Sequence, residues 1–118
     1  VLWSEGVATG RISVARFVDV TSTQAAKLFG LYPQKGTIAP GSDADLVIWN
    51  PDETRTVDGA TMHSNANYSP YDGWEVTGWP ALTISRGEIV ARGTANGIDV
   101  TGQPGRGRAA DRSRFARP

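Results

Sequence analysis

The chain contains no cysteine and a single histidine, His63, among its 118 residues. The absence of cysteine excludes disulfides and thiolate metal ligands, and it is typical of proteins from a reducing compartment, so we expect a cytoplasmic location. One histidine is a poor basis for a zinc site, because catalytic zinc commonly needs about three protein ligands that include two or more histidines. We therefore interpret His63 as a polar loop residue that makes hydrogen bonds.

The chain also lacks long hydrophobic runs and a net charge. No apolar run approaches the roughly 20 residues that cross a membrane, and 12 basic residues balance 12 acidic ones. We therefore expect no membrane and no nucleic-acid partner. The opening VLWSEGVATG has no basic region of a signal peptide and no initiator Met, so we expect the true start to lie upstream. The length predicts one domain or part of one.

The first third of the sequence predicts helices. Apolar residues recur at helical spacing from Ser13 to Thr21, with Ser13 as the N-cap. A second helix is predicted from Ser22 to Phe29, with its N-cap among residues 21–23 and with Gly30 in the position of a C′ glycine. A shorter helix is predicted from Leu2 to Ala8.

The middle of the sequence predicts strands and turns. The apolar run Leu46 to Trp49 is typical of a strand buried on both faces, and Thr54 to Val57 could pair with it. Ala81 to Ser85 and Glu88 to Ala91 predict a β-hairpin around the turn Arg86-Gly87. Between them, residues 61–80 predict an ordered loop rich in aromatic side chains. Such large side chains are more typical of cores and interfaces than of a binding platform.

The stretch KGTIAPGSDADLVIW places Asp43 and Asp45 where a Pro-Gly turn meets the first predicted strand. Residues i and i+2 of a strand share a face, so the two carboxylates could converge. A calcium site needs about six or more oxygen ligands, and the residues after Asp45 are apolar. We therefore interpret both aspartates as structural caps of backbone N–H groups at the turn and the strand start.

Other polar side chains lie in the aromatic loop. A Ser-His-Asp triad could combine His63 with Ser64 or Ser69 and Asp72, but no nucleophile-elbow motif is present. Asp72 and Glu75 could form an acid–base pair, yet loop carboxylates also accept backbone N–H bonds, and that interpretation is preferred. We predict no catalytic, substrate-binding or metal-binding residue in this chain.

The basic residues are unevenly spread. Lys27 and Lys35, the only lysines, have no motif around them and fit surface positions on a helix and a turn. From Gln103 onward the sequence holds five arginines and one aspartate, a charge of about +4 against about −4 elsewhere. Phe115 is the one aromatic residue there, which is too little for single-strand recognition. We expect this segment to pack on a neighbouring subunit.

Several long motifs resemble one family. LFGLYPQKGTIAPGSDADLVIWNP resembles the segment where a metal-dependent amidohydrolase leaves its barrel and enters a small β-domain. HSNANYSPYDGWEVTGWPALTISRGEIVARG, followed by GQPGRGR, is similar to the C-terminus of the hydantoinase/dihydropyrimidinase branch, and TSTQAAKLFGLYP and LWSEGVATGRIS fit that branch too. The resemblance extends to about Arg108. Asn67 departs from the usual aspartate, and Gln24-Ala25 departs from the usual Asn-Pro.

The resemblance implies an α+β fragment, with terminal helices of a TIM-like (β/α)8 barrel followed by C-terminal strands of a composite β-sandwich domain and an extended tail. Residues 1–33 would be the last barrel helices, and residues 34–95 would belong to the small β-sandwich domain, including the aromatic loop 61–80. Residues 96–118 would be the tail. Without the rest of the sandwich, these strands would leave open sheet edges and apolar faces.

The resemblance also implies cofactors and partners. The family holds two divalent metals, expected to be zinc, with four histidines, a carboxylated lysine and an aspartate on barrel strands. These residues would precede Val1, so we expect no cofactor in this chain itself. Its partners would be the remainder of the same polypeptide and further copies in a homo-oligomer, a dimer or tetramer built partly through the C-terminal region.

The implied function is the opening of a cyclic amide, a hydantoin or a dihydropyrimidine, by attack of a metal-activated hydroxide on the ring carbonyl. Because catalytic residues are not expected here, the chain alone is predicted to be inactive. One alternative is a non-enzymatic dihydropyrimidinase-like interaction protein, which keeps the fold and loses the metal ligands. The other is an Arg-tail binding module, which a steep salt dependence of polyanion binding would support.

Overall fold

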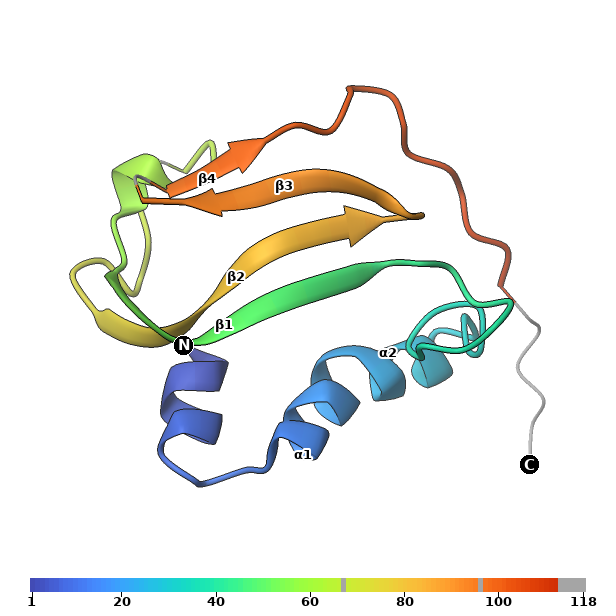
Figure 1. The fold of residues 1–118 in the computed structure, drawn as a ribbon, viewed down its shortest axis with the longest axis horizontal. Coiled ribbons are helices and arrows are strands. Elements are labelled where there is room, and N and C mark those ends of the chain that lie inside the picture. The colour runs from blue at the N-terminus through green and yellow to red at the C-terminus, as the bar shows by residue number, and fades with distance from the viewer. Residues whose placement is uncertain (67, 96, 113–118) are drawn as a thin grey trace.

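The computed structural model describes residues 1–66, 68–95 and 97–112. It is an α+β structure in which a helical part comes first and a four-stranded antiparallel sheet follows (Figure 1). The elements, in chain order, are η1 (Trp3–Ala8), α1 (Val14–Val18), η2 (Asp19–Thr23), α2 (Gln24–Leu28), β1 (Leu46–Thr56), η3 (Gly59–Thr61), β2 (Glu75–Ser85), β3 (Glu88–Thr94) and β4 (Gly97–Val100). No helix in the described part of the chain has the length and apolar character to cross a membrane.

The ends of the main helical segment, residues 14–28, follow local sequence chemistry. The Ser13 hydroxyl accepts a hydrogen bond from the Arg16 N–H at 3.1 Å, which confirms the predicted N-cap. At the other end, Gly30 has φ +69 and donates to the Lys27 carbonyl, while Leu31 donates to the Ala26 carbonyl. This pair of bonds is a Schellman motif, and it confirms the predicted C′ glycine.

The prediction of two separate helices between Ser13 and Phe29 is wrong. α1, the π-helical segment η2 and α2 follow one another without an interruption. Thr23 has helical dihedrals and makes no capping bond, because its hydroxyl donates to the Gly36 carbonyl instead. Thr21 likewise donates to the Phe17 carbonyl one turn earlier. Hydroxyls used in this way leave the backbone free to continue as a helix.

The sheet is a meander in which each strand pairs with its neighbour in the sequence, in the order β1-β2-β3-β4. Ser85 pairs with Glu88 across a two-residue turn, which confirms the predicted hairpin. Arg86 and Gly87 both have positive φ, +49 and +81, as a type I′ turn requires. This turn lies at the end of the sheet where the C-terminal segment also passes.

Strand β1 differs from its prediction in two respects. Thr54 belongs to the same strand as Leu46, and both ends of β1 pair with β2, so residues 54–57 do not form a separate partner strand. Val47 and Ile48 keep 53% and 47% of their surface exposed. Because neighbouring residues of a strand point to opposite faces, the described residues do not bury β1 on both faces.

Two other strand boundaries were not anticipated. β2 begins at Glu75, inside the segment predicted as the aromatic loop. β4 pairs with β3, from Ala91 opposite Val100 to Thr94 opposite Gly97, at the start of the segment predicted as an extended tail. The short sequence of β4 has no run of apolar residues, so only its pairing reveals it.

The helical part contacts the sheet through an aromatic cluster, which we define as Trp3, Phe17 and Trp49. The ring centroids of Trp3 lie 5.3 Å from Phe17 and 5.4 Å from Trp49, and Phe17 lies 5.9 Å from Trp49. Gly78 of β2 faces Trp3 so closely that a Cβ there would lie 2.1 Å from the Trp3 Cδ1 atom. The cluster therefore holds η1 and α1 against the sheet. Figure 1 shows the helical part beside β1.

Candidate functional site

The densest group of charged contacts surrounds Lys35, in the loop that joins α2 to β1. The Lys35 ammonium lies between the carboxylates of Asp43, at 2.7 Å, and Asp45. The loop places them together because the Asp43 N–H donates to the Gln34 carbonyl at 2.9 Å. Ser42, which follows the turn, donates to the Pro33 carbonyl at 2.8 Å and closes the same loop.

Asp45 also holds the hairpin turn between β2 and β3. Its second carboxylate oxygen accepts a hydrogen bond from the backbone N–H of Arg86 at 2.7 Å. This contact confirms the interpretation of Asp45 as a cap of a turn. The same interpretation is wrong for Asp43, whose carboxylate in the described part of the chain accepts from the side chain of Gln34 at 3.3 Å and pairs with Lys35. Lys35 lies in a loop, as the interpretation of a surface turn position expects, but the sequence did not reveal that its ammonium joins both aspartates of the D-x-D sequence.

The ion pairs shift the pKa values of their members. Hydrogen bonds to Asp43 and then to Asp45 raise the pKa of Lys35 above its ordinary value. The hydrogen bond from Lys35, helped by the Arg86 N–H, lowers the pKa of Asp45. Each group is thus held in its charged form. A general acid or base near neutral pH needs the opposite, so this geometry stabilises structure rather than transferring protons.

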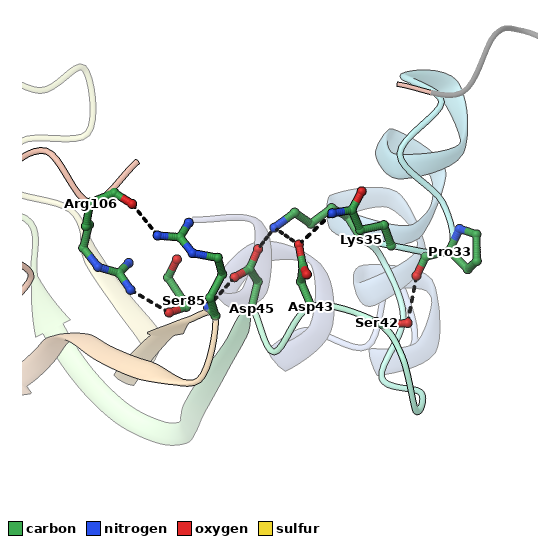
Figure 2. Close-up of polar contacts among 9 residues, drawn as sticks. Pro33, Lys35, Ser42, Asp43, Asp45, Ser85 and Arg106 are labelled. Atoms are coloured by element: carbon green, nitrogen blue, oxygen red, sulfur yellow. Dashed lines mark hydrogen bonds and ion pairs between the residues drawn. The ribbon is translucent and has the colours of Figure 1, made fainter. Parts of the chain in front are cut away.

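The contacts continue from the turn to the C-terminal segment. The Arg86 guanidinium donates to the Arg106 carbonyl, and the Arg106 guanidinium donates to the Ser85 carbonyl at 2.9 Å. Arg106 also pairs with Glu88 at 2.9 Å. Figure 2 shows this series of contacts running from Lys35 through Asp45 to Arg106. It ties together the loop after α2, the hairpin turn and residues 105–107.

The side chains considered for a triad have separate local partners. His63 bonds through Nε2 to the Ile98 carbonyl at 3.0 Å. Ser64 and Ser69 accept backbone N–H bonds within their own turns, from Ala66 and Tyr71. Asp72 accepts the Gly59 N–H at 2.6 Å. The described residues therefore do not bring these side chains together as a nucleophile, base and orienting acid.

The acidic residues show no ligand set for a metal either. No three His, Asp or Glu side chains within the described ranges lie close enough to hold an ion. Asp72 is bonded to a backbone N–H, and Glu75 begins β2 opposite Thr56. The divalent metals that the resemblance implies therefore do not fit the donors present in this part of the chain.

The aromatic residues divide into two sets. Trp49 and Trp79 are half-buried: Trp49 joins the aromatic cluster, and the guanidinium of Arg55 stacks over Trp79 with 5.0 Å to the ring centroid. A second set is exposed, with Tyr68 at 70% and Trp74 at 48%. Tyr71 packs edge-on against Trp74. Beside Trp79, a cavity of about 360 Å³ extends to His63 and Ile98.

Part of the C-terminal segment packs on its own chain. Arg106 bonds to the hairpin, and Arg112 donates to the Phe29 carbonyl at 3.0 Å. The prediction for Arg114, Phe115 and Arg117 lies outside the described residues, as does the departure at Asn67. Sequence reasoning missed the roles of Arg86 and Arg106, and the only signal was their position beside glycines in two turns.

Known proteins are similar to this chain along nearly its whole length. The model of the Amidohydrolase family matches residues 1–90. The chain is 46% identical over 115 residues to a D-hydantoinase of Geobacillus stearothermophilus, which is 98% of this chain and 24% of that protein. It is 48% identical over 116 residues to a dihydropyrimidinase of Rattus norvegicus, covering 98% of this chain and 22% of that one.

Solved structures give the same result. The crystal structure of a dihydropyrimidinase from Brevibacillus agri NCHU1002 superposes with a TM-score of 0.90 and 50% identity, over 99% of this chain and 24% of that one. The chain thus spans about a quarter of the length of the relatives it matches.

Proposed function

Because this chain belongs to the amidohydrolase family, we propose that it is the C-terminal segment of a hydrolase that opens cyclic amides of the hydantoin or dihydropyrimidine type. The observation that carries the proposal is the likeness to hydantoinases and dihydropyrimidinases over 98–99% of the chain, at 46–50% identity. A TM-score of 0.90 over nearly the whole chain supports the same arrangement of helices and strands.

In this proposal the segment is a scaffold. η1, α1 and α2 would cover the outside of a (β/α)8 barrel, and β1 to β4 would complete a β-sandwich with strands from elsewhere in the polypeptide. The half-exposed Val47 and Ile48 support this role, because apolar strand residues require a cover. The remainder of the same polypeptide is the proposed cover.

The hydrolytic chemistry would then lie outside this segment. The amidohydrolase family is metal-dependent, and the donors described here do not form a metal site. We place the two divalent metals and the carboxylated lysine in the remaining part of the polypeptide. Within this segment, the ion pairs of Lys35 would fix the junction between the helical part and the sheet. We further propose a cytoplasmic homo-oligomer, a dimer or a tetramer.

The test compares the full-length polypeptide with the 118-residue segment. With divalent metal supplied, the full-length protein is expected to hydrolyse hydantoin or dihydrouracil, whereas the segment is expected to do neither. Hydrolysis by the segment alone would contradict the scaffold role. A folded, metal-loaded full-length protein that hydrolyses neither ring would favour the alternative, a non-enzymatic dihydropyrimidinase-like interaction protein.

A further inference from the structure

A cavity of about 390 Å³ lies where the hairpin turn meets the C-terminal segment. Its lining consists of Arg86, Glu88, Gly105, Arg106, Gly107 and Arg108. The cavity thus joins two parts of the chain that are about 20 residues apart, and the hydrogen bonds between Arg86 and Arg106 hold them together. The volume falls within the range of small-molecule sites.

The charge in this cavity is unbalanced. Three of the residues that line it are arginines, against a single acidic residue, Glu88. Glu88 pairs with Arg106, but its side chain is 75% exposed, so water screens much of its charge. Within the described part of the chain, the guanidinium groups of Arg86 and Arg106 otherwise contact neutral backbone carbonyls, which satisfy hydrogen-bond donors without cancelling charge. The residues that line the cavity therefore carry a formal net charge of about +2.

The guanidinium groups also retain unused donors. Each guanidinium has five N–H donors. Arg106 uses one terminal nitrogen for Ser85 and Glu88, and Arg86 uses one terminal nitrogen for the Arg106 carbonyl. Arg108 has no hydrogen bond or ion pair with any residue in the ranges that the structure describes. Most of the donors around the cavity are therefore available to a ligand.

Two of the three arginines are already held in place. The Arg106 side chain is only 21% exposed and is anchored at the Ser85 carbonyl. Arg86 lies in a tight turn, and its backbone N–H is held by a hydrogen bond to the Asp45 carboxylate. A ligand that binds here would therefore lose little free energy to ordering these side chains, which is the basis of preorganised binding.

We propose that this cavity is a binding site for an oxyanion group, a carboxylate or a phosphate, held by Arg86, Arg106 and Arg108. The forked guanidinium matches the geometry of both groups. The oxyanion has two sources. It is carried by a small molecule, or it is the carboxylate of an Asp or Glu on a second copy of the protein.

The test uses the full-length polypeptide and inorganic phosphate as the probe. Binding is measured by calorimetric titration at constant ionic strength, and the oligomeric state is measured by light scattering. The key variant is Arg108→Gln, because Arg108 makes no hydrogen bond or ion pair in the described part of the chain. Arg92→Gln, an exposed arginine of β3 outside the cavity, is the matched control. Arg108→Lys separates the forked geometry from the charge.

If Arg108→Gln weakens phosphate binding about tenfold or more and Arg92→Gln leaves it unchanged, the result supports a site that binds a small-molecule oxyanion. If the parent protein does not bind phosphate but Arg108→Gln loses the oligomer, the result supports a site that is occupied by a carboxylate of a second copy. In both cases Arg108→Lys should restore part of the effect. If neither phosphate binding nor the oligomer depends on Arg108, the proposal is overturned. Because both readouts are independent of hydantoin hydrolysis, this failure is distinct from a failure of the proposed function.

Discussion

Arg112 donates its Nε hydrogen to the carbonyl oxygen of Phe29 at 3.0 Å, although 83 positions separate the two residues. Phe29 is the C-cap of α2, where unpaired carbonyls gather and a positive charge is favourable. The contact brings the C-terminal segment back to the helical part, on the side of the molecule opposite the aromatic loop (Figure 1).

Substituting Arg112 by alanine should release this attachment. The contact is exposed, so the loss of stability should be small, about 0.5–1 kcal/mol. Amide exchange of residues 101–112 should become faster, while exchange in β3 should stay the same. Arg92→Ala, which removes an arginine from β3, should leave exchange of residues 101–112 unchanged. Equal exchange in Arg112→Ala and the parent protein would contradict the contact.

The ion pairs around Lys35 predict a loss of stability at both ends of the pH scale. Asp45 has a lowered pKa. Its contribution to folding stability is therefore fully present when the pH is above the ordinary aspartate pKa of 3.8, and it is lost as the pH falls through the lowered pKa. Lys35 has a raised pKa. Its contribution to folding stability is therefore fully present when the pH is below the ordinary lysine pKa of 10.5, and it is lost as the pH rises through the raised pKa. Thermal unfolding across the pH range measures both losses.

Substituting Lys35 by glutamine should change this pH profile in a defined way. The alkaline loss assigned to Lys35 should disappear, and the acid loss should move to higher pH, because Asp45 no longer has its cation. At neutral pH the variant should be about 1 kcal/mol less stable. Lys27→Gln is the matched control, because the Lys27 ammonium contacts the Tyr32 ring at 5.2 Å and, among the described residues, not an aspartate. This variant should lose stability at the same acidic pH as the parent protein. An unchanged profile in Lys35→Gln would refute the pairing.

Gly78→Ala should destabilise the contact between β2 and η1. The new Cβ would lie 2.1 Å from the Trp3 Cδ1 atom, and Gly78 has φ +89. Gly73→Ala is a suitable control, since Gly73 has φ +77 but nothing within 4 Å of the new Cβ. Both variants bear backbone strain, and only Gly78→Ala adds a clash. Its free energy of unfolding should fall about 1–3 kcal/mol further than that of Gly73→Ala. Equal values from urea unfolding would be inconsistent with the close contact.

Phe17→Ala tests the aromatic cluster. Removing the ring leaves a gap beside Trp3 and Trp49, and the free energy of unfolding should fall by roughly 2 kcal/mol or more. Phe29→Ala removes the same ring from a position that is 54% exposed and should have a smaller effect. Tryptophan fluorescence should change in Phe17→Ala alone. A larger effect of Phe29→Ala would show that the cluster does not join the helical part to the sheet.

The features that the sequence predicted correctly depend on nearby residues. Ser13 caps a backbone N–H three residues away, and Gly30 ends a helix through bonds to residues 26 and 27. The Arg86-Gly87 turn needs only two residues with positive φ. Each of these is decided by the local backbone, so a pattern in the sequence is sufficient.

The features that were missed depend on distant residues. Asp45 and Arg86 are 41 positions apart, and their contact exists only because β1 and β2 pair in one register. β4 has little strand character of its own and is defined by its pairing with β3. Thr23 looks like an N-cap until its hydroxyl is seen on the Gly36 carbonyl. Spacing rules cannot supply such partners, because the fold brings them together.

Strand β1 lies at one edge of the described sheet, and its pairing with β2 is interrupted between Asn50 and Thr54. Pro51 falls in that interruption and has no N–H to offer to a further strand. An incoming strand would find no backbone donor at Pro51, so it could pair continuously only with the residues on one side of that position. Uncontrolled edge-to-edge aggregation is discouraged, while the stretch with the exposed Val47 and Ile48 stays open to one strand of matching length.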